Sequence, residues 1–231
     1  MEKVALISGA SRGIGRAIAD ELAARGYRLS LGARRPQELE AAFPDRARVL
    51  LQAYEARDLQ APRDWVAATL ATFGRIDVLV NSAGICKHIG LEDGDADLLE
   101  ETMDINVKAP YRLIQAAFEA LKVSGQGRVI NLSSLSGKRV RNLNVGYQMS
   151  KHAVIALNHG VRRAGWEFGI RATAVCPGYV STDMAAAISS MAPEEMTSPQ
   201  ALATLVANTI ELPNTASVAE LLVNCAYENL M

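Results

Sequence analysis

The chain is poor in the residues that form disulfides and metal sites. Of its 231 residues, three are cysteine and three are histidine. Cys86, Cys176 and Cys225 lie far apart and show no metal-ligand spacing, so we expect reduced thiols and no metal. No apolar run approaches the ~18 residues that cross a bilayer. Residues 1–8 lead into a predicted strand without the layout of a signal peptide. These absences predict a soluble, cytoplasmic protein.

A large excess of charge of one sign is also missing. The sequence has 24 Lys and Arg against 25 Asp and Glu, for a formal net charge of −1. This balance gives no electrostatic reason to expect nucleic acid or a membrane as a partner. No linker rich in Pro, Gly and Ser, no repeat and no low-complexity block divides the chain. We therefore predict one domain over residues 1–231.

Short apolar runs that suit β-strands alternate with longer stretches of helical periodicity. Some runs are continuous, such as Val-Leu-Val at 78–80, as expected for strands covered on both faces. The alternation predicts βαβ units and an α/β fold, a Rossmann-type doubly wound parallel sheet of seven strands with helices on both faces. Strands are expected near Val4–Ser8, Arg28–Ala33, Val49–Ala53, Ile76–Asn81, Arg128–Ser133, Ala172–Cys176 and Val218–Asn224, and helices near 14–25, 36–42, 60–73, 97–121, 148–167 and 199–211.

One long irregular segment follows the sixth predicted strand. Residues 177–199 are rich in Met and small residues. Loops of this length in a compact domain are usually functional. In a doubly wound sheet, a loop at the carboxyl end of a strand lies on the ligand-binding edge. We therefore predict a substrate loop at about 177–199.

A glycine-rich turn, Ser8-Gly-Ala-Ser-Arg-Gly-Ile-Gly15, joins the first predicted strand to the first predicted helix. Glycine allows a close backbone approach, and a helix N-terminus attracts a pyrophosphate. No Gly-Lys-Ser/Thr follows, which disfavours a nucleoside-triphosphate loop. The turn predicts a dinucleotide site, and its contributing residues would be Gly9, Ser11, Arg12, Gly13, Ile14 and Gly15.

Basic residues predict which dinucleotide binds. The second strand ends at Arg34 and Arg35, with no carboxylate before Glu38, and Arg12 lies in the glycine turn. An acidic residue at this strand end would bind the ribose 2′-hydroxyl of NAD, whereas arginines bind the 2′-phosphate of NADP. We therefore predict NADP(H) as the cofactor.

Three side chains farther along suggest carbonyl chemistry. Tyr147 and Lys151 are four positions apart on a predicted helix, and Ser134 stands thirteen positions before Tyr147. A neighbouring ammonium would lower the pKa of the Tyr147 phenol from its ordinary value near 10. A phenol, an ammonium and a hydroxyl beside a dinucleotide suit reduction of a carbonyl. The thirteen-residue spacing favours Ser134 over Ser133.

In this order and spacing the motifs resemble those of the short-chain dehydrogenase/reductase family, of the compact type. The resemblance rests on the glycine turn, Asn81-Ser-Ala-Gly84, Asn106, Ser134, Tyr147-xxx-Lys151 and Pro177-Gly178. It implies an NADP(H)-dependent oxidoreductase that interconverts a small-molecule carbonyl and an alcohol. Its catalytic residues would be Asn106, Ser134, Tyr147 and Lys151, and further cofactor contacts would come from Glu55, Asn81, Ala83, Gly84, Pro177, Gly178, Val180 and Thr182.

The resemblance also implies a homodimer or homotetramer, with subunit contacts through helices near 103–122 and 147–167.

Some positions depart from the family pattern. Glu55 stands where relatives commonly have an aspartate beside the adenine, and Asp58 then suits a helix N-cap. Residues 223–231 replace the glycine-rich tail of many relatives. Between Ser134 and Tyr147, Lys138, Arg139 and Arg141 either attract an anionic substrate or form a solvated loop.

Two other functions use the same residues. The chain could be a nucleotide-sensing or scaffold protein that has lost chemistry, or an epimerase or dehydratase that uses the same Tyr/Lys pair. A Ser-His-Asp hydrolase is poorly supported, because His88 and His159 have no adjacent Ser or Cys to activate. The substrate loop carries no chemical signature that identifies the substrate.

Overall fold

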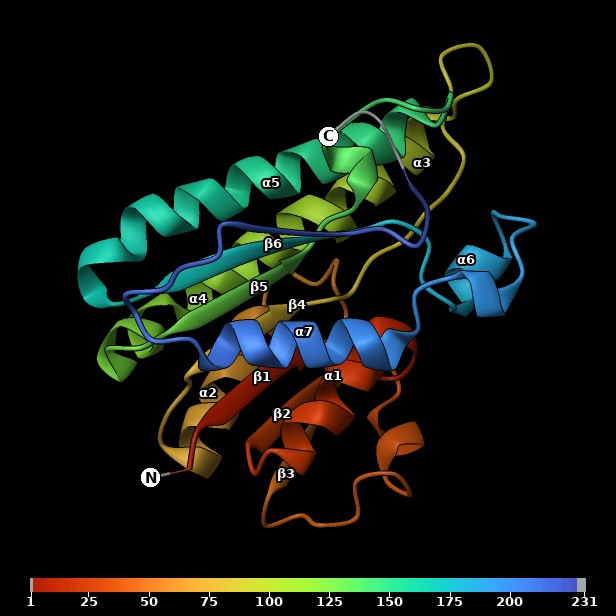
Figure 1. The fold of residues 1–231 in the computed structure, drawn as a ribbon. Coiled ribbons are helices and arrows are strands. Elements are labelled where there is room, and N and C mark those ends of the chain that lie inside the picture. Colours follow the sequence, from red (N-terminus) through yellow and green to blue (C-terminus); the bar gives the residue numbers. More distant parts are fainter. Residues whose placement is uncertain (1, 228–231) are drawn as a thin grey trace.

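The computed structural model describes residues 2–227 and contains one parallel sheet of seven strands. The strand order is β3-β2-β1-β4-β5-β6-β7, so the predicted Rossmann-type fold is confirmed (Figure 1). Of the C-terminal tail at 223–231 discussed above, residues 228–231 lie outside the described part of the chain. The strands are β1 (Val4–Ser8), β2 (Arg28–Ala33), β3 (Val49–Ala53), β4 (Val78–Asn81), β5 (Arg128–Leu132), β6 (Arg171–Pro177) and β7 (Glu220–Val223).

Helices cover both faces of the sheet because successive side chains on a strand point to opposite faces. Ile7 packs into the core under α1 (Gly13–Ala24) and α7 (Pro199–Glu211), whereas its neighbour Leu6 packs under α2 (Ala61–Phe73) and α4 (Ala109–Ser124). The long helix α5 (Val145–Gly165) lies on the same face as α2 and α4 (Figure 1). The continuous apolar strands are therefore buried on both sides.

Two expected helices differ in the structure. The predicted helix at 36–42 is only a 3₁₀ turn, η1 (Pro36–Leu39), and the residue before Pro44 is disfavoured in helical conformation. The predicted helix at 97–121 is divided into α3 (Ala96–Met103), a π-helical turn η2 (Asp104–Lys108) and α4. Such π-turns are frequent at functional sites. Hydrophobic periodicity did not reveal this break.

The carboxyl edge of the sheet gathers the predicted site. Strand order reverses between β1 and β4, and ligands bind at such a switch point. The segment after β6 is not wholly irregular, because it contains α6 (Asp183–Ala186) and a 3₁₀ turn η5 (Pro193–Glu195). Val180 forms a bridge with Thr197, which ties the two ends of the segment together. Figure 1 shows α6 projecting beyond the sheet at this edge. Among the described residues, no helix could span a membrane.

Candidate active site

The glycine turn is folded so tightly that side chains are excluded from it. Gly9 has a φ of 70°, and a Cβ there would lie 2.7 Å from the backbone nitrogen of Ala83. A Cβ on Gly15 would overlap the carbonyl oxygen of Gly9. The backbone of the β1–α1 turn therefore lies directly against the end of β4. The N-terminus of α1 opens from this turn and provides unpaired N–H groups for an anion.

The predicted 2′-phosphate residues lie at the surface. Arg34 and Arg35 are exposed at the end of β2, and Arg35 forms an ion pair with Glu38 at 2.9 Å. Arg12 instead pairs with Asp183, also at 2.9 Å. Glu55 is exposed after β3.

Asp58 accepts hydrogen bonds from the backbone nitrogens of Gln60 and Ala61, at 2.8 and 3.3 Å. Asp58 therefore holds the turn that leads into α2. The N-cap of this helix is Gln60, without a side-chain cap, so the predicted N-cap role of Asp58 is wrong.

The end of β4 is held by side-chain hydrogen bonds. The hydroxyl of Ser8 accepts from the backbone nitrogens of Ser82 and Ala83, at 3.2 and 3.3 Å. Asn81 is buried and donates its amide to Asn131 on β5 at 2.9 Å. The Asn81 side chain therefore joins two strands, and the backbone that follows it faces the glycine turn.

Asn106 lies in the π-turn and fixes the loop after β4. Its side chain accepts from the backbone nitrogen of Ile85 and donates to the carbonyl of the same residue, both at 2.9 Å. It also donates to the hydroxyl of Ser150 on α5 at 3.1 Å. A Cβ on Gly84 would lie 3.2 Å from the Asn106 amide oxygen and 3.8 Å from Lys151 Nζ. Asn106, Gly84 and Lys151 are therefore neighbours, although they come from three separate segments.

Tyr147 and Lys151 project from one side of α5 because they are one helical turn apart. Lys151 Nζ lies 5.5 Å from the centroid of the Tyr147 ring and donates to the carbonyl of Leu132 at 2.8 Å. The Ser134 hydroxyl lies near enough to the Tyr147 phenol for its hydrogen bonding to lower the pKa of that phenol. The structure therefore brings the phenol, the ammonium and the hydroxyl together at the ends of β5 and α5.

Ser133 has a different environment from its neighbour. It is buried, and its hydroxyl donates to the backbone carbonyl of Lys151 at 2.9 Å. Ser134 is only half-buried, and its hydroxyl also donates to the carbonyl of Pro177 at a longer 3.4 Å. The two adjacent hydroxyls therefore have different partners, and only Ser133 is bonded to the backbone of α5.

The pKa of Tyr147 differs in direction from the sequence-based expectation. Burial raises its pKa above the ordinary value, the nearby Cys86 thiol acts in the same direction, and the hydrogen bond with Ser134 opposes them. Burial also lowers the pKa of Lys151 to about 8. The expected lowering of the Tyr147 pKa is therefore wrong for this structure, because burial makes the largest contribution and raises the pKa. The phenol stays protonated at neutral pH.

The residues predicted after β6 follow the same edge. The backbone nitrogen of Gly178 donates to the carbonyl of Val223 at 2.8 Å, which fixes Pro177-Gly178 beside β7. Val180 is buried, and Thr182 accepts from the backbone nitrogen of Ala185 and so caps α6. A Cβ on Gly13 would lie 3.3 Å from the methyl group of Thr182. The segment after β6, which is the predicted substrate segment at 177–199, therefore begins against the glycine turn.

Comparison with known proteins agrees with this geometry. A family model described as short chain dehydrogenase matches residues 3–193. The chain belongs to this family. An agropine synthesis reductase from Rhizobium rhizogenes is 43% identical over 229 residues, which are 98% of this chain and 53% of the relative. The chain thus spans about half the length of that relative. An acetoacetyl-CoA reductase from Rhizobium meliloti (strain 1021) is 30% identical, over 87% of this chain and 83% of the relative.

Solved structures of short-chain dehydrogenases have the same fold. An alcohol dehydrogenase from the archaeon Thermococcus sibiricus, complexed with 5-hydroxy-NADP, superposes with a TM-score of 0.90 and 28% identity over 100% of both chains. An actinorhodin polyketide ketoreductase with NADPH gives a TM-score of 0.86 and 27% identity, over 96% of this chain and 95% of that chain. The likeness to both structures extends over nearly the whole chain and is not limited to the glycine turn.

Asn144 has a structural role that the sequence analysis did not identify. Its amide oxygen accepts from the backbone nitrogens of Ile89 and Tyr147, at 3.1 and 3.4 Å. Its amide nitrogen donates to the carbonyl of Lys87 at 2.8 Å. Asn144 therefore caps α5 and joins it to the loop after β4. An asparagine directly before the first helical residue is a recognisable N-cap signal, and it could have identified Asn144.

The basic loop between Ser134 and Tyr147 is partly neutralised. Lys138 pairs with Glu220 at 2.6 Å, and Glu220 also contacts His159 at 2.8 Å. These contacts lower the pKa of Glu220, chiefly through the hydrogen bond with Lys138. Lys138 therefore contacts the first residue of β7. This ion pair favours a structural role for Lys138 over attraction of an anionic substrate.

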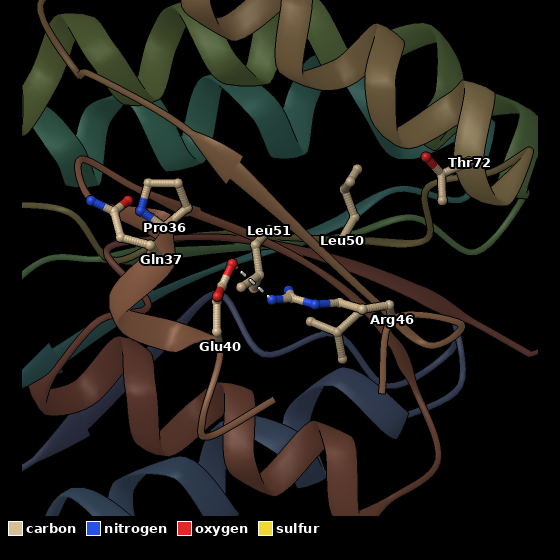
Figure 2. A pocket seen from close by; sticks show the side chains of 8 residues that line it. Pro36, Gln37, Glu40, Arg46, Leu50, Leu51 and Thr72 are labelled. Carbon is tan, nitrogen blue, oxygen red and sulfur yellow. Dashed lines mark ion pairs between the residues drawn. The ribbon is translucent and has the colours of Figure 1, made fainter. Parts of the chain in front are cut away.

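Two cavities lie apart from these residues. One of about 510 Å³ lies beside the edge strand β3, where Glu40 and Arg46 form an ion pair at 3.2 Å (Figure 2). The other, of about 420 Å³, lies between α2 and α4. Neither is lined by a residue predicted for the site. Because β3 is four strands away from β5, the first cavity is not part of the Tyr147 site.

Proposed function

We propose that this short-chain dehydrogenase is an NADP(H)-dependent oxidoreductase that reversibly reduces a small-molecule carbonyl to an alcohol. The observation that carries the proposal is the meeting of Ser134, Tyr147 and Lys151. The ammonium lies 5.5 Å from the centroid of the Tyr147 ring, and Ser134 is near enough to the phenol to act on its pKa. The names of relatives and structural neighbours support it, because they include reductases and proteins in complex with NADPH or an NADP derivative.

The residues present fit a nicotinamide dinucleotide. The backbone at Gly9 and Gly15 leaves no room for side chains, and the N-terminus of α1 favours a pyrophosphate. Arg12, Arg34 and Arg35 would hold the 2′-phosphate through charge-assisted hydrogen bonds. The bound cofactor would supply the hydride. Further contacts would come from the predicted residues Ser11, Ile14, Glu55, Asn81, Ala83, Gly84, Pro177, Gly178, Val180 and Thr182.

Each catalytic side chain has a distinct role. Tyr147 donates its phenolic proton to the carbonyl oxygen in reduction and accepts it back in oxidation. Its raised pKa keeps the proton on the phenol at neutral pH, which suits the acid role. Ser134 donates a hydrogen bond to the carbonyl oxygen as negative charge develops there. Lys151 would bind the nicotinamide ribose hydroxyls, and Asn106 would hold the loop and the π-turn beside Lys151.

The proposal is tested by following nicotinamide oxidation against a broad panel of carbonyl compounds, with NADPH and NADH in parallel. We expect net consumption of NADPH with some carbonyls and a lower KM for NADPH than for NADH. An epimerase would convert substrate without net consumption, and a nucleotide-sensing protein would bind NADPH without turnover. Comparable KM values for the two cofactors would contradict the NADP(H) preference alone.

We also propose that the chain forms a homodimer or homotetramer through α4 and α5. Several large apolar side chains on and just after these helices are exposed, and such groups are usually buried in an interface. They are Tyr111, Val123, Met149, Trp166 and Phe168. Light scattering coupled to size exclusion measures the assembly, and a monomer at micromolar concentration would contradict it.

A further inference from the structure

The substrate segment touches the glycine turn through one ion pair and one packing contact. Asp183, the first residue of α6, pairs with Arg12 at 2.9 Å, although 171 positions separate them in the sequence. Beside this pair, Thr182 packs against Gly13. The beginning of α6 is therefore held against the turn that would bind the pyrophosphate.

The ion pair uses a guanidinium that the proposed cofactor also needs. The Arg12 side chain is 74% exposed and that of Asp183 is 75% exposed, so the pair is readily exchanged for another anion. A 2′-phosphate carries more negative charge than a carboxylate and offers three acceptor oxygens. It would also repel the Asp183 carboxylate nearby. Binding of NADPH therefore requires Arg12 to leave Asp183, whereas binding of NADH does not.

The other paired arginine does not connect the two sides in this way. Arg35 pairs with Glu38, which is three positions away on the same short turn after β2. Exchange of that pair would leave the substrate segment unaffected. Of these two ion pairs, the one formed by Arg12 joins the glycine turn to α6, and the one formed by Arg35 does not.

We propose that Asp183 is a specificity-determining residue, which competes with the 2′-phosphate of NADP(H) for Arg12. This inference rests on the proposed NADP(H) function. The carboxylate reduces the affinity for NADPH without reducing the affinity for NADH. The Asp183 carboxylate also couples recognition of the 2′-phosphate to release of α6 from the glycine turn. Helix α6 lies near the start of the substrate segment.

Titration of the whole protein with NADPH and with NADH, at low ionic strength, tests the inference. The Asp183→Asn variant should bind NADPH about twofold to fivefold more tightly, as expected for loss of an exposed ion pair, and should bind NADH unchanged. In an Arg12→Gln background the same substitution should have a much smaller effect on NADPH, because only the repulsion between Asp183 and the 2′-phosphate would then be relieved. Asp20→Asn is the matched control, because Asp20 pairs with Arg16 at 2.9 Å on α1 and should change neither affinity.

The outcomes separate the inference from the function on which it rests. If Arg12→Gln leaves the ratio of the two affinities unchanged, the proposed role of Arg12 in NADP(H) preference is wrong. If Arg12→Gln weakens NADPH but Asp183→Asn has no effect, only the inference about Asp183 is overturned. An equal gain in affinity for NADPH and NADH would also overturn it, because it would indicate general opening of the cleft without competition for Arg12.

Discussion

Lys151 donates a hydrogen bond from its ammonium to the carbonyl oxygen of Leu132, 2.8 Å away at the end of β5. The side chain is 7% exposed, and the structure gives this ammonium no carboxylate partner among the described residues. Burial without an opposite charge disfavours the protonated form, which is why the pKa of Lys151 falls to about 8. The site therefore holds a cation at a cost in stability.

This cost predicts an unusual pH dependence of folding. Between about pH 8 and the ordinary value of 10.5, folding releases the Lys151 proton, so the stability of the protein rises with pH in that window. Below pH 8 the penalty is fully present. Compared with Lys151→Met, the wild-type protein should gain on the order of 3 kcal/mol between pH 7 and 10.5. Urea unfolding across this range, without cofactor, measures the difference, and parallel curves would contradict it.

The two adjacent serines should separate stability from catalysis. Ser134→Ala removes a donor to the carbonyl oxygen and should lower kcat about 100-fold, with a loss of stability near 1 kcal/mol. Ser133→Ala removes one buried hydrogen bond to the Lys151 carbonyl, which α5 still pairs, so it should cost about 1 kcal/mol and lower kcat much less. Steady-state kinetics and urea midpoints of both variants test the assignment. A larger fall in kcat for Ser133→Ala would reverse it.

The close approach at Gly9 predicts a steric penalty beyond that of its backbone conformation. Gly9→Ala should destabilise the protein by about 2–4 kcal/mol, because its Cβ would lie 2.7 Å from the Ala83 nitrogen. Gly26 provides a matched control. It has a similar φ of 84° with no atom within 4 Å of a Cβ, so Gly26→Ala should cost only about 1–2 kcal/mol. Equal losses in urea unfolding would show that the contact with Ala83 is unimportant.

The sequence predicted the sheet well because each strand is an apolar run bounded by polar or turn residues. The alternation of strands and helices fixed the order of the layers, since βαβ units have one hand. Hydrophobic spacing alone did not predict the π-turn at Asp104–Lys108, because a one-residue bulge leaves the apolar spacing nearly unchanged. Pro44 ended the helix expected after β2 sooner than its apolar residues suggested.

The candidate site was predictable in its residue types and not in its electrostatics. Spacing along α5 placed Tyr147 and Lys151 on one side, and the structure agrees. The direction of the Tyr147 pKa depends on burial by residues from several loops, which sequence spacing does not reveal. The pairing of Arg12 with Asp183 also joins segments 171 positions apart. Long-range contacts of this kind follow only from the folded chain.

The most direct test of the account measures the role of the Tyr147 hydroxyl. Tyr147→Phe keeps the aromatic ring and removes the proton that would be donated. We expect this variant to bind NADPH within about threefold of the wild type and to lose at least 100-fold in kcat for carbonyl reduction. Turnover within tenfold of the wild type, with NADPH binding intact, would show that another group donates the proton.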